Sequence, residues 1–370
     1  MTSQPDRRPP AIAPPVIAVV IPSYRVKAHI LSVIAGIGDE CALIYIVDDR
    51  CPEGSGQHVL DRCTDPRVRV LFHEVNQGVG GSVLSGYRQA VADGATVIVK
   101  IDGDGQMDPS WIPALVTEIN SDEADYAKGD RFYDRESIAG MPRMRVFGNA
   151  SLSFLTKISS GYWDIVDPTN GFTAINAAVA SALPAAKISK RYFFESDMLF
   201  RLGCMRARVV DIPMPSIYGD EVSGLSIRKV VGEFARKHLV NTIKRVLYTY
   251  FVRSFSIASI ELVVGLLMFL FGVTFGAVTW FTNSMQGQET LSGTVMVAAL
   301  PAILGFQLLL AFVSADIASV PTRAIGRRLS LIRPRATSAS TALPGVARVV
   351  AIGGASSSEP ARVTAGGEVA

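Results

Sequence analysis

The 370-residue sequence has few cysteines, few histidines and little charge, and each shortage excludes a class of protein or site. Its four cysteines form no CxxC pair, which argues against a zinc site and favours free thiols. Its four histidines are not clustered either. A net charge of +3 is too small to indicate a nucleic-acid-binding protein, so we expect no nucleic-acid partner.

Charge is missing altogether from two stretches near the C-terminal end. Residues 262–288 and 290–315 contain no Asp, Glu, Lys or Arg. Each run reaches the ~20 residues that cross a ~30 Å hydrocarbon layer. Two buried core helices are the alternative, but uninterrupted apolar length argues against half-buried helices. Because basic residues flank the outer sides and only Glu289 lies between, we expect a multi-pass protein of the cytoplasmic (inner) membrane.

The charge pattern divides the chain into five parts. We expect two transmembrane helices over 257–320, with both termini in the cytoplasm. Residues 223–256 have helical periodicity with interleaved cations, which predicts amphipathic juxtamembrane helices; an ordinary domain helix is the alternative. Residues 1–15 are proline-rich and predict a flexible leader. Residues 321–370 are basic at first and then rich in Ala, Ser and Gly, which predicts a disordered cytoplasmic tail.

The remaining part, residues 16–222, has the pattern of an α/β domain. Short β-branched runs occur at 16–21, 43–47, 68–72 and 96–101, and segments that suit helices separate several of them. This alternation predicts a parallel, doubly wound sheet. Ligands bind such sheets at the carboxyl ends of the strands, so the polar residues that follow each run are the candidate site.

Acidic and glycine-rich turns follow these predicted strands. Asp48-Asp49 follows the second run, and Asp102-Gly103-Asp104-Gly105-Gln106 follows the fourth. Paired carboxylates on a glycine-flanked turn suit Mg²⁺ or Mn²⁺, although a solvated acidic turn is the alternative. The glycines around Gly80 allow a ligand to approach the backbone, unless they only form a tight turn.

Taken in order, VIPSY, IVDD, NQGVGGS, DGDGQ, GDRF, DPTNGF and the two apolar spans resemble family 2 glycosyltransferases of the GT-A fold. Within that family they look most like the polyprenyl-phosphate sugar synthases, the dolichol-phosphate mannose synthase group. The resemblance covers residues 16–320. It implies an α/β fold with a doubly wound, mixed, Rossmann-like sheet, followed by amphipathic interfacial helices and a two-helix transmembrane hairpin.

The resemblance also implies roles for individual residues, by their match to the family's motifs. For the nucleotide the implied contacts are Pro22, Tyr24, Asp49, Gly80, Asp102 and Arg131. For Mg²⁺ or Mn²⁺ they are Asp102, Asp104 and Gln106, and for the sugar Asp167, Thr169, Gly171, Phe172 and Glu195. For the lipid phosphate they are Ser223, Arg228 and Lys229, although the last two cations could simply attract anionic lipids. The implied catalytic set is Asp102, Asp104, Arg131, Asp167 and Glu195, with no general base assigned.

The implied function is an inverting, metal-dependent transfer from a UDP- or GDP-linked sugar to a polyprenyl phosphate of the undecaprenyl or dolichyl type. The transfer would take place on the cytoplasmic face, with the catalytic domain in the cytoplasm. One alternative is a GT-A transferase with another lipid-linked acceptor. Another is a non-catalytic membrane protein that binds nucleotide-sugars. Glycines in the first span, Gly265, Gly272 and Gly276, suggest a homo-oligomer. No QxxRW motif is present, which argues against processive polysaccharide synthesis.

Overall fold

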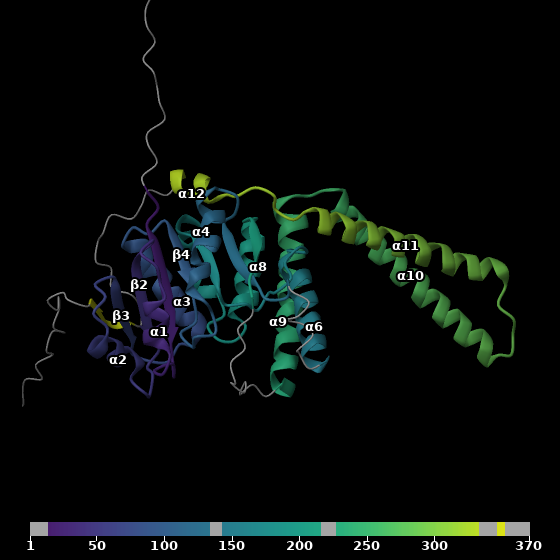
Figure 1. Ribbon diagram of the computed structural model, residues 1–370. Coiled ribbons are helices and arrows are strands. Elements are labelled where there is room, and N and C mark those ends of the chain that lie inside the picture. Colours follow the sequence, from purple (N-terminus) through teal and green to yellow (C-terminus); the bar gives the residue numbers. More distant parts are fainter. Residues whose placement is uncertain (1–13, 134–142, 216–226, 333–345, 352–370) are drawn as a thin grey trace, which may run out of the picture.

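The computed structural model describes residues 14–133, 143–215, 227–332 and 346–351. Within these ranges the side chains of 143–147, 227–231, 346–348 and 351 are not described. Figure 1 shows an α/β domain from which a pair of long helices projects.

The core of the domain is a mixed sheet in the order β7-β5-β6-β4-β1-β2-β3-β8. The strands are β1 (Ile17–Ser23), β2 (Cys41–Asp48), β3 (Val68–His73), β4 (Val97–Lys100), β5 (Tyr126–Asp130), β6 (Thr173–Asn176), β7 (Val209–Pro213) and β8 (Val346–Ala351). The four strands predicted from apolar runs are β1 to β4, and they pair in parallel. The prediction of a doubly wound α/β sheet is confirmed.

The direction of strand β6 determines which segment lies beside the carboxyl ends of β4 and β5. It runs antiparallel to both β4 and β5, so its N-terminal end lies beside their carboxyl ends. The DPTNGF segment, residues 167–172, therefore reaches the edge where β1, β2, β4 and β5 end.

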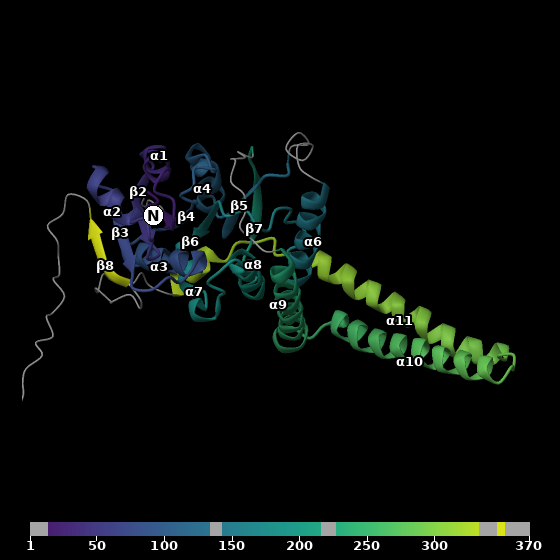
Figure 2. The same ribbon diagram turned by 90° about the horizontal axis from the view of Figure 1, so that it is seen from below.

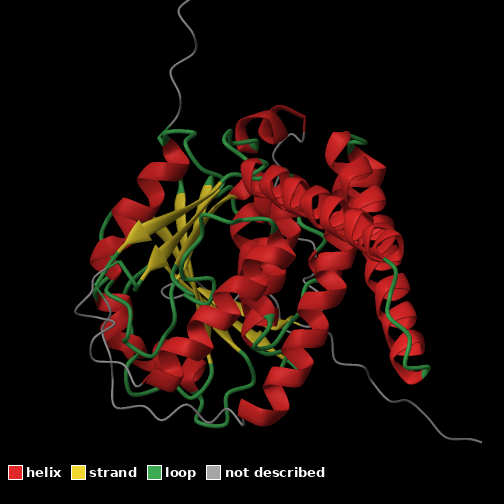
Figure 3. Cartoon of the chain, turned by 90° about the vertical axis from the view of Figure 1, so that its right-hand side faces the viewer, coloured by secondary structure: helices red, strands yellow, loops and turns green. Residues whose placement is uncertain are grey.

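Both faces of the sheet are covered by helices because successive strand residues are apolar on either side (Figure 3). One face packs against α1 (Ile30–Ala35), α2 (Ser55–Arg62) and α4 (Ile112–Asn120). The other packs against α3 (Val79–Ala92), α7 (Ala177–Ala182) and α8 (Phe194–Met205). Short 3₁₀ turns at Pro109–Trp111 and Ala185–Lys187 precede α4 and α8.

Helices α6 (Arg143–Ser160) and α9 (Ile227–Leu247) lie side by side at the end of the domain nearest the projecting helices (Figure 1). The face of α9 that packs on the domain contains three buried polar residues, His238, Asn241 and Arg245, beside Phe234, whose ring lies 5.2 Å from that of Phe193. Its apolar residues Leu239, Val240, Ile243 and Leu247 are exposed instead. A helix with its polar face inward requires an apolar environment on the other side.

The projecting helices are α10 (Ile257–Met285) and α11 (Ser292–Ala318), which follow a π-helical turn, η3, at Tyr248–Arg253. They run side by side away from the domain and cross the direction of α9 (Figures 1 and 2). Both are long and apolar enough to cross a membrane by length and composition. Gly272 packs inside this pair, because a Cβ there would lie 2.6 Å from the Ala298 carbonyl oxygen. The glycines thus serve the contact between α10 and α11, and they give no support to a homo-oligomer.

The segment after the hairpin differs from the predicted disordered tail. It returns to the domain, where the buried Asp125 carboxylate accepts the N–H groups of Ile325 and Gly326, and then forms α12 (Gly326–Ile332). Further on, β8 adds to the edge of β3 in antiparallel fashion. Its sequence, VARVVA, contains three valines, and β-branched residues favour a strand within a segment otherwise rich in Ala, Ser and Gly. The predicted leader lies almost entirely outside the described residues.

Candidate active site

The candidate site lies at the edge of the sheet where β1, β2, β4 and β5 end. At the end of β1, Pro22 is half-buried and Tyr24 is exposed. The guanidinium of Arg25 lies 5.5 Å from the centre of the Tyr24 ring. Arg25 thus covers one face of the exposed Tyr24 ring, and the predicted contact of Tyr24 with the nucleoside stays a prediction.

The two aspartates after β2 are buried and hold loops. Asp48 accepts the N–H groups of Cys51 and Gly56 at 2.8 and 2.7 Å. Asp49 accepts the N–H groups of Gln77 and Gly78, both at 2.7 Å, and its Oδ1 lies 2.7 Å from His73 Nδ1. Asp49 thus fixes the glycine-rich loop, and its predicted contact with the nucleoside stays a prediction.

At Gly80, the glycine-rich loop packs against the segment at the start of α8 and does not border an open site. The Gly80 N–H donates to the Lys190 carbonyl at 2.9 Å. A Cβ at Gly80 would meet the Phe194 ring at 2.5 Å and the Ser189 carbonyl oxygen at 2.7 Å. The space beside this glycine is filled by the start of α8, so Gly80 is better explained by helix packing than by nucleotide binding.

A buried lysine joins the end of β4 to α8. Lys100 Nζ lies 3.0 Å from Asp102 Oδ1 and 3.2 Å from Glu195 Oε1. Burial of the ammonium opposes its charge, but Asp102 and Glu195 outweigh this and raise the pKa of Lys100. The structure therefore brings together two of the predicted catalytic carboxylates through a cation that the motif comparison did not include.

The remaining metal candidates lie on the turn after Asp102. Asp104 and Gln106 are half-buried, and the Gln106 N–H donates to Asp104 Oδ1 at 3.0 Å. Within the described ranges no three His, Cys, Asp or Glu side chains group closely enough to hold a metal ion. The donor chemistry, carboxylate and amide oxygen, suits a hard divalent ion that completes its shell with water and phosphate oxygens.

A second charged group lies at the ends of β5 and β6. Arg131 Nε donates to Asp167 Oδ2 at 2.7 Å, and the Thr169 hydroxyl donates to Asp167 Oδ1 at 3.0 Å. The buried Lys128 ammonium contacts the Asp167 carbonyl oxygen. Burial opposes the charge of Asp167, but Lys128 and Arg131 outweigh it and lower its pKa. Asp167 is thus an ionised carboxylate that orients Arg131.

The glycine and phenylalanine of DPTNGF have different roles. A Cβ at Gly171 would lie 2.6 Å from Asp102 Oδ2 and would also meet Lys100 Nζ, so glycine is required beside this ion pair. Phe172, in contrast, is 1% exposed and belongs to the core beneath the sheet. The prediction that Phe172 contacts the sugar is wrong, because its ring is needed for packing.

The predicted lipid-phosphate residues are not described by the structure. Ser223 lies outside the described residues. Arg228 and Lys229 lie in the first turn of α9, but their side chains are not described. Their predicted contact with the acceptor stays a prediction.

Sequence reasoning missed three buried polar residues that support the site: Lys100, Lys128 and His73. A signal was present for Lys100, which ends the otherwise apolar strand VIVK, because a buried lysine needs a partner; the signal for Lys128 is weaker, since its strand YAKGD also contains Asp130. His73 ends β3 and bridges Asp49 and the Ser85 hydroxyl, 3.0 Å from its Nε2. Nothing local in the sequence indicates that contact.

Comparison with known proteins agrees with this architecture. Residues 18–183 match the model of the Glycosyl transferase family 2. A UDP-N-acetylglucosamine–dolichyl-phosphate N-acetylglucosaminyltransferase of Methanococcus voltae is 30% identical over 41% of this chain and 60% of its own length. An undecaprenyl-phosphate mannosyltransferase of Micrococcus luteus is 29% identical over 51% of this chain and 78% of its own. A polyprenol monophosphomannose synthase of Mycolicibacterium smegmatis is 25% identical over 59% and 84%.

The match to a family 2 glycosyltransferase is confined to residues 18–183, a little under half of the chain, and this stretch carries most of the strands that form the candidate site. The relatives named above act on dolichyl, undecaprenyl and polyprenyl phosphates, according to their names. The chain spans 60% of the length of the first of them.

Proposed function

We propose that this protein transfers a sugar from a UDP- or GDP-linked donor to a polyprenyl phosphate at the cytoplasmic surface of the membrane. The observation that carries the proposal is the meeting of two charged groups, Lys100–Asp102–Glu195 and Arg131–Asp167, at one edge of a family 2 domain. The three relatives with polyprenyl-type acceptors support the acceptor class.

The donor would bind with its base at Tyr24 and its diphosphate near the DGDGQ turn. Asp102 and Asp104, with Gln106, would hold Mg²⁺ or Mn²⁺, which neutralises charge on the diphosphate as the glycosidic bond breaks. Arg131 is oriented by the ionised Asp167 and would contact the same leaving group. Thr169 and Glu195 would then line the sugar.

The acceptor phosphate needs little activation. Its second pKa is ~6, so it is largely ionised near neutral pH and can attack the anomeric carbon directly. Such an in-line displacement inverts the anomeric configuration. Catalysis then consists mainly of positioning and charge stabilisation, and no general base is assigned.

The arrangement of the helices supports membrane placement of the acceptor. If α10 and α11 cross the bilayer, α9 lies along its surface, because the hairpin crosses the direction of α9 (Figures 1 and 2). The exposed apolar residues of α9 would then enter the headgroup region. The start of α9 follows β7, whose carboxyl end belongs to the same edge as Asp130, so the helix would reach from the active site to the hairpin.

A transfer assay tests the proposal. The purified protein in lipid nanodiscs is incubated with labelled nucleotide-sugars, undecaprenyl phosphate and Mn²⁺ or Mg²⁺. We expect organic-extractable label in a lipid monophosphate sugar, from which mild acid releases the labelled sugar. Label in an extended lipid-linked glycan would favour the alternative acceptor, and binding without turnover would contradict the enzyme assignment.

The metal assignment has a matched control on the same turn. Asp104→Asn keeps an oxygen for the Gln106 N–H but removes the charge, and we expect at least about a hundredfold loss of transfer. Asp108→Asn, at the exposed cap of the following turn, should keep activity within about twofold. Equal activity of both variants would refute the role of Asp104.

A further inference from the structure

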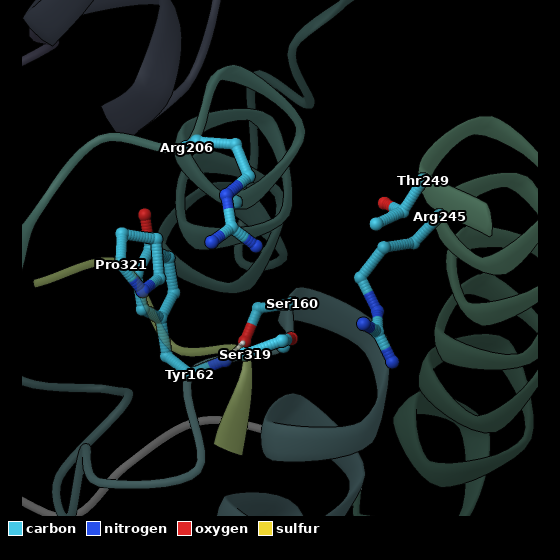
Figure 4. Close-up of a pocket in the computed structure, with 9 residues that line it drawn as sticks. Ser160, Tyr162, Arg206, Arg245, Thr249, Ser319 and Pro321 are labelled. Atoms are coloured by element: carbon cyan, nitrogen blue, oxygen red, sulfur yellow. Dashed lines mark hydrogen bonds between the residues drawn. The ribbon is translucent and has the colours of Figure 1, made fainter. Parts of the chain in front are cut away.

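A small polar pocket lies where the domain, α9 and the base of the hairpin meet (Figure 4). Its enclosed cavity volume is only about 10 Å³, room for about one water molecule, and the wider hollow of about 270 Å³ includes open solvent. Its polar lining consists of Ser160, Tyr162, Arg206, Arg245, Thr249 and Ser319. These residues come from the ends of α6, α8 and α9, from η3 and from the residue that follows α11, so the pocket depends on a docked hairpin.

The lining contains two arginines and no acidic residue. The charge of Arg245 is already balanced, because its Nη1 and Nη2 lie 2.7 and 2.9 Å from the two carboxylate oxygens of Asp316. Arg206 differs: among the residues that the structure describes, it makes no ion pair and no side-chain hydrogen bond. It is half-buried, and Figure 4 shows its guanidinium reaching into the pocket.

The backbone fixes Arg206 in this position. It ends α8 in the left-handed conformation, with φ 63°, and its N–H donates to the Gly203 carbonyl at 3.0 Å. The half-buried guanidinium has five N–H donors and no protein acceptor among the described residues, so these donors are available to an anion. The hydroxyls of Ser160, Thr249 and Ser319 supply further polar groups around the same space.

Neighbouring arginines make the surroundings more positive. Arg253 Nη1 donates to the Cys204 carbonyl at 2.8 Å. Burial raises the pKa of the Cys204 thiol, and Arg201, Arg245 and Arg253 partly offset that rise, which places three guanidinium groups around this cysteine. Asp197 lies 3.7 Å from Arg201, and Asp316 pairs with Arg245, so Arg206 and Arg253 supply the unbalanced charge.

The residues that border the two apolar helices indicate the depth of the pocket relative to the bilayer. Arg253 ends η3, just before α10 begins at Ile257, and Ser319 directly follows α11. These are the two points where the apolar helices stop, and lipid phosphates lie at that depth in a bilayer. The candidate active site lies at the carboxyl end of β5, whereas the chain after α11 contacts Asp125, just before the start of β5. A ligand here is therefore distinct from the reacting acceptor.

We propose that this pocket binds the phosphate of an anionic phospholipid, with Arg206 as the principal contact. The guanidinium forms charge-assisted hydrogen bonds to phosphate oxygens, and the hydroxyl groups complete the site. The shared chemistry is a phosphate group, and the depth of the pocket assigns it to a lipid headgroup. The inference rests on the proposed membrane placement, but not on the transferase reaction.

Lipid binding to the purified full-length protein tests the assignment. Native mass spectrometry in detergent, titrated with phosphatidylglycerol, is compared for wild type, Arg206→Gln and Arg208→Gln. Arg208 lies two residues away and pairs with the exposed Glu123 at 2.8 Å, so its variant removes the same charge outside the pocket. We expect Arg206→Gln to weaken the tightest site by about tenfold, as loss of a charged hydrogen bond implies, and Arg208→Gln to change it less than twofold.

The other arms identify the source of the phosphate. Phosphatidylcholine should bind this site at least about fivefold more weakly than phosphatidylglycerol. Inorganic phosphate at millimolar concentration should not raise the melting temperature of wild type above that of Arg206→Gln. Equal binding by both arginine variants would overturn the site, and an Arg206-dependent shift with inorganic phosphate would overturn the lipid. Transfer activity is not the readout, so a failed transfer assay leaves this result interpretable.

Discussion

At the scale of single residues, glycine decides whether the charged groups of the site can meet. Gly171 stands where a side chain would displace the Lys100–Asp102 pair, with Asp102 Oδ2 only 2.6 Å from the position of a Cβ. The backbone at this position, and not only the carboxylates, therefore sets the geometry of the turn after β4.

Gly171→Ala tests this steric argument. The added methyl group must displace either Asp102 or Lys100, so we expect at least a tenfold loss of transfer from a protein that still folds. Gly148→Ala is the control, since Gly148 lies in α6 with nothing within 4 Å of its Cβ position. It should keep full activity. Wild-type activity of Gly171→Ala would mean that the pair can shift without consequence.

The sequence predicted the carboxylates of the site better than it predicted their partners. Asp102, Asp104 and Asp167 stand in short motifs, so local pattern was enough to find them. Lys100 meets Glu195 only because α8 packs beside the end of β4, and Lys128 meets Asp167 only because β6, which follows Asp167, pairs with β5. Phe172 was misjudged for the opposite reason: its motif is polar, but its ring turns into the core.

At the scale of elements, α9 was predicted from its period but its orientation was not. The apolar residues Leu239, Ile243 and Leu247 face outward because the inward face is occupied by polar residues that bond to α6 and α8. Strand β8 was missed because its partner β3 is remote in sequence, and strand pairing of that kind leaves no local mark.

The orientation of α9 predicts its depth in the membrane. A nitroxide attached at Ile243→Cys, in a cysteine-free background in nanodiscs, should be more accessible to oxygen than to a nickel chelate. Lys244→Cys is the control, because it is exposed at nearly the same height but lies ~100° round the helix. It should show the reverse preference. Equal preference at both positions would contradict a membrane-facing surface on Ile243.

The packing of α9 on the domain should also depend on pH through His238. Burial lowers the pKa of His238 to about 4, below its ordinary value of 6.5, so the docked helix holds the neutral form. As the pH falls, His238 is protonated first in the undocked form, because its pKa is higher there. Docking of α9 is therefore strongest above pH 6.5 and weakens as the pH falls towards 4. Between pH 7.5 and 5.5 we expect the free energy of opening α9 to fall by about 1.4 kcal/mol.

Hydrogen exchange of the α9 amides at several pH values measures that opening. His238→Gln should remove most of the pH dependence, because glutamine does not titrate. The variant should still dock, because its amide can bond to the Ser159 hydroxyl, which lies 2.8 Å from His238 Nδ1 in the wild type. His58→Gln, on the distant α2, should leave it unchanged. A pH dependence that survives in His238→Gln would assign it to another group.

At the scale of the whole molecule, the C-terminal side of the hairpin is held to the domain at two points. On the return side, Asp125 accepts the N–H groups of Ile325 and Gly326. At the base, the Asp316 carboxylate accepts hydrogen bonds from Arg245, from the Tyr250 hydroxyl at 2.6 Å and from Trp163 Nε1 at 2.9 Å. The hairpin and the α/β domain are therefore joined by buried polar contacts.

Breaking the Asp316 contacts should destabilise this junction more than replacing both partners of the ion pair. Asp316→Leu leaves the buried Arg245 unpaired, and loss of one member of such a pair costs about 3–5 kcal/mol. The double variant Arg245→Met, Asp316→Leu leaves no buried charge and should regain a large part of that stability.

Thermal inactivation in detergent, combined with proteolysis of the segment between η3 and α10, measures the stability of this junction. Glu233→Gln, which breaks an exposed ion pair on α9, should have no measurable effect. If the double variant is as unstable as the sum of the two single variants, the pair is not coupled, and the hairpin is held to the domain by apolar packing instead.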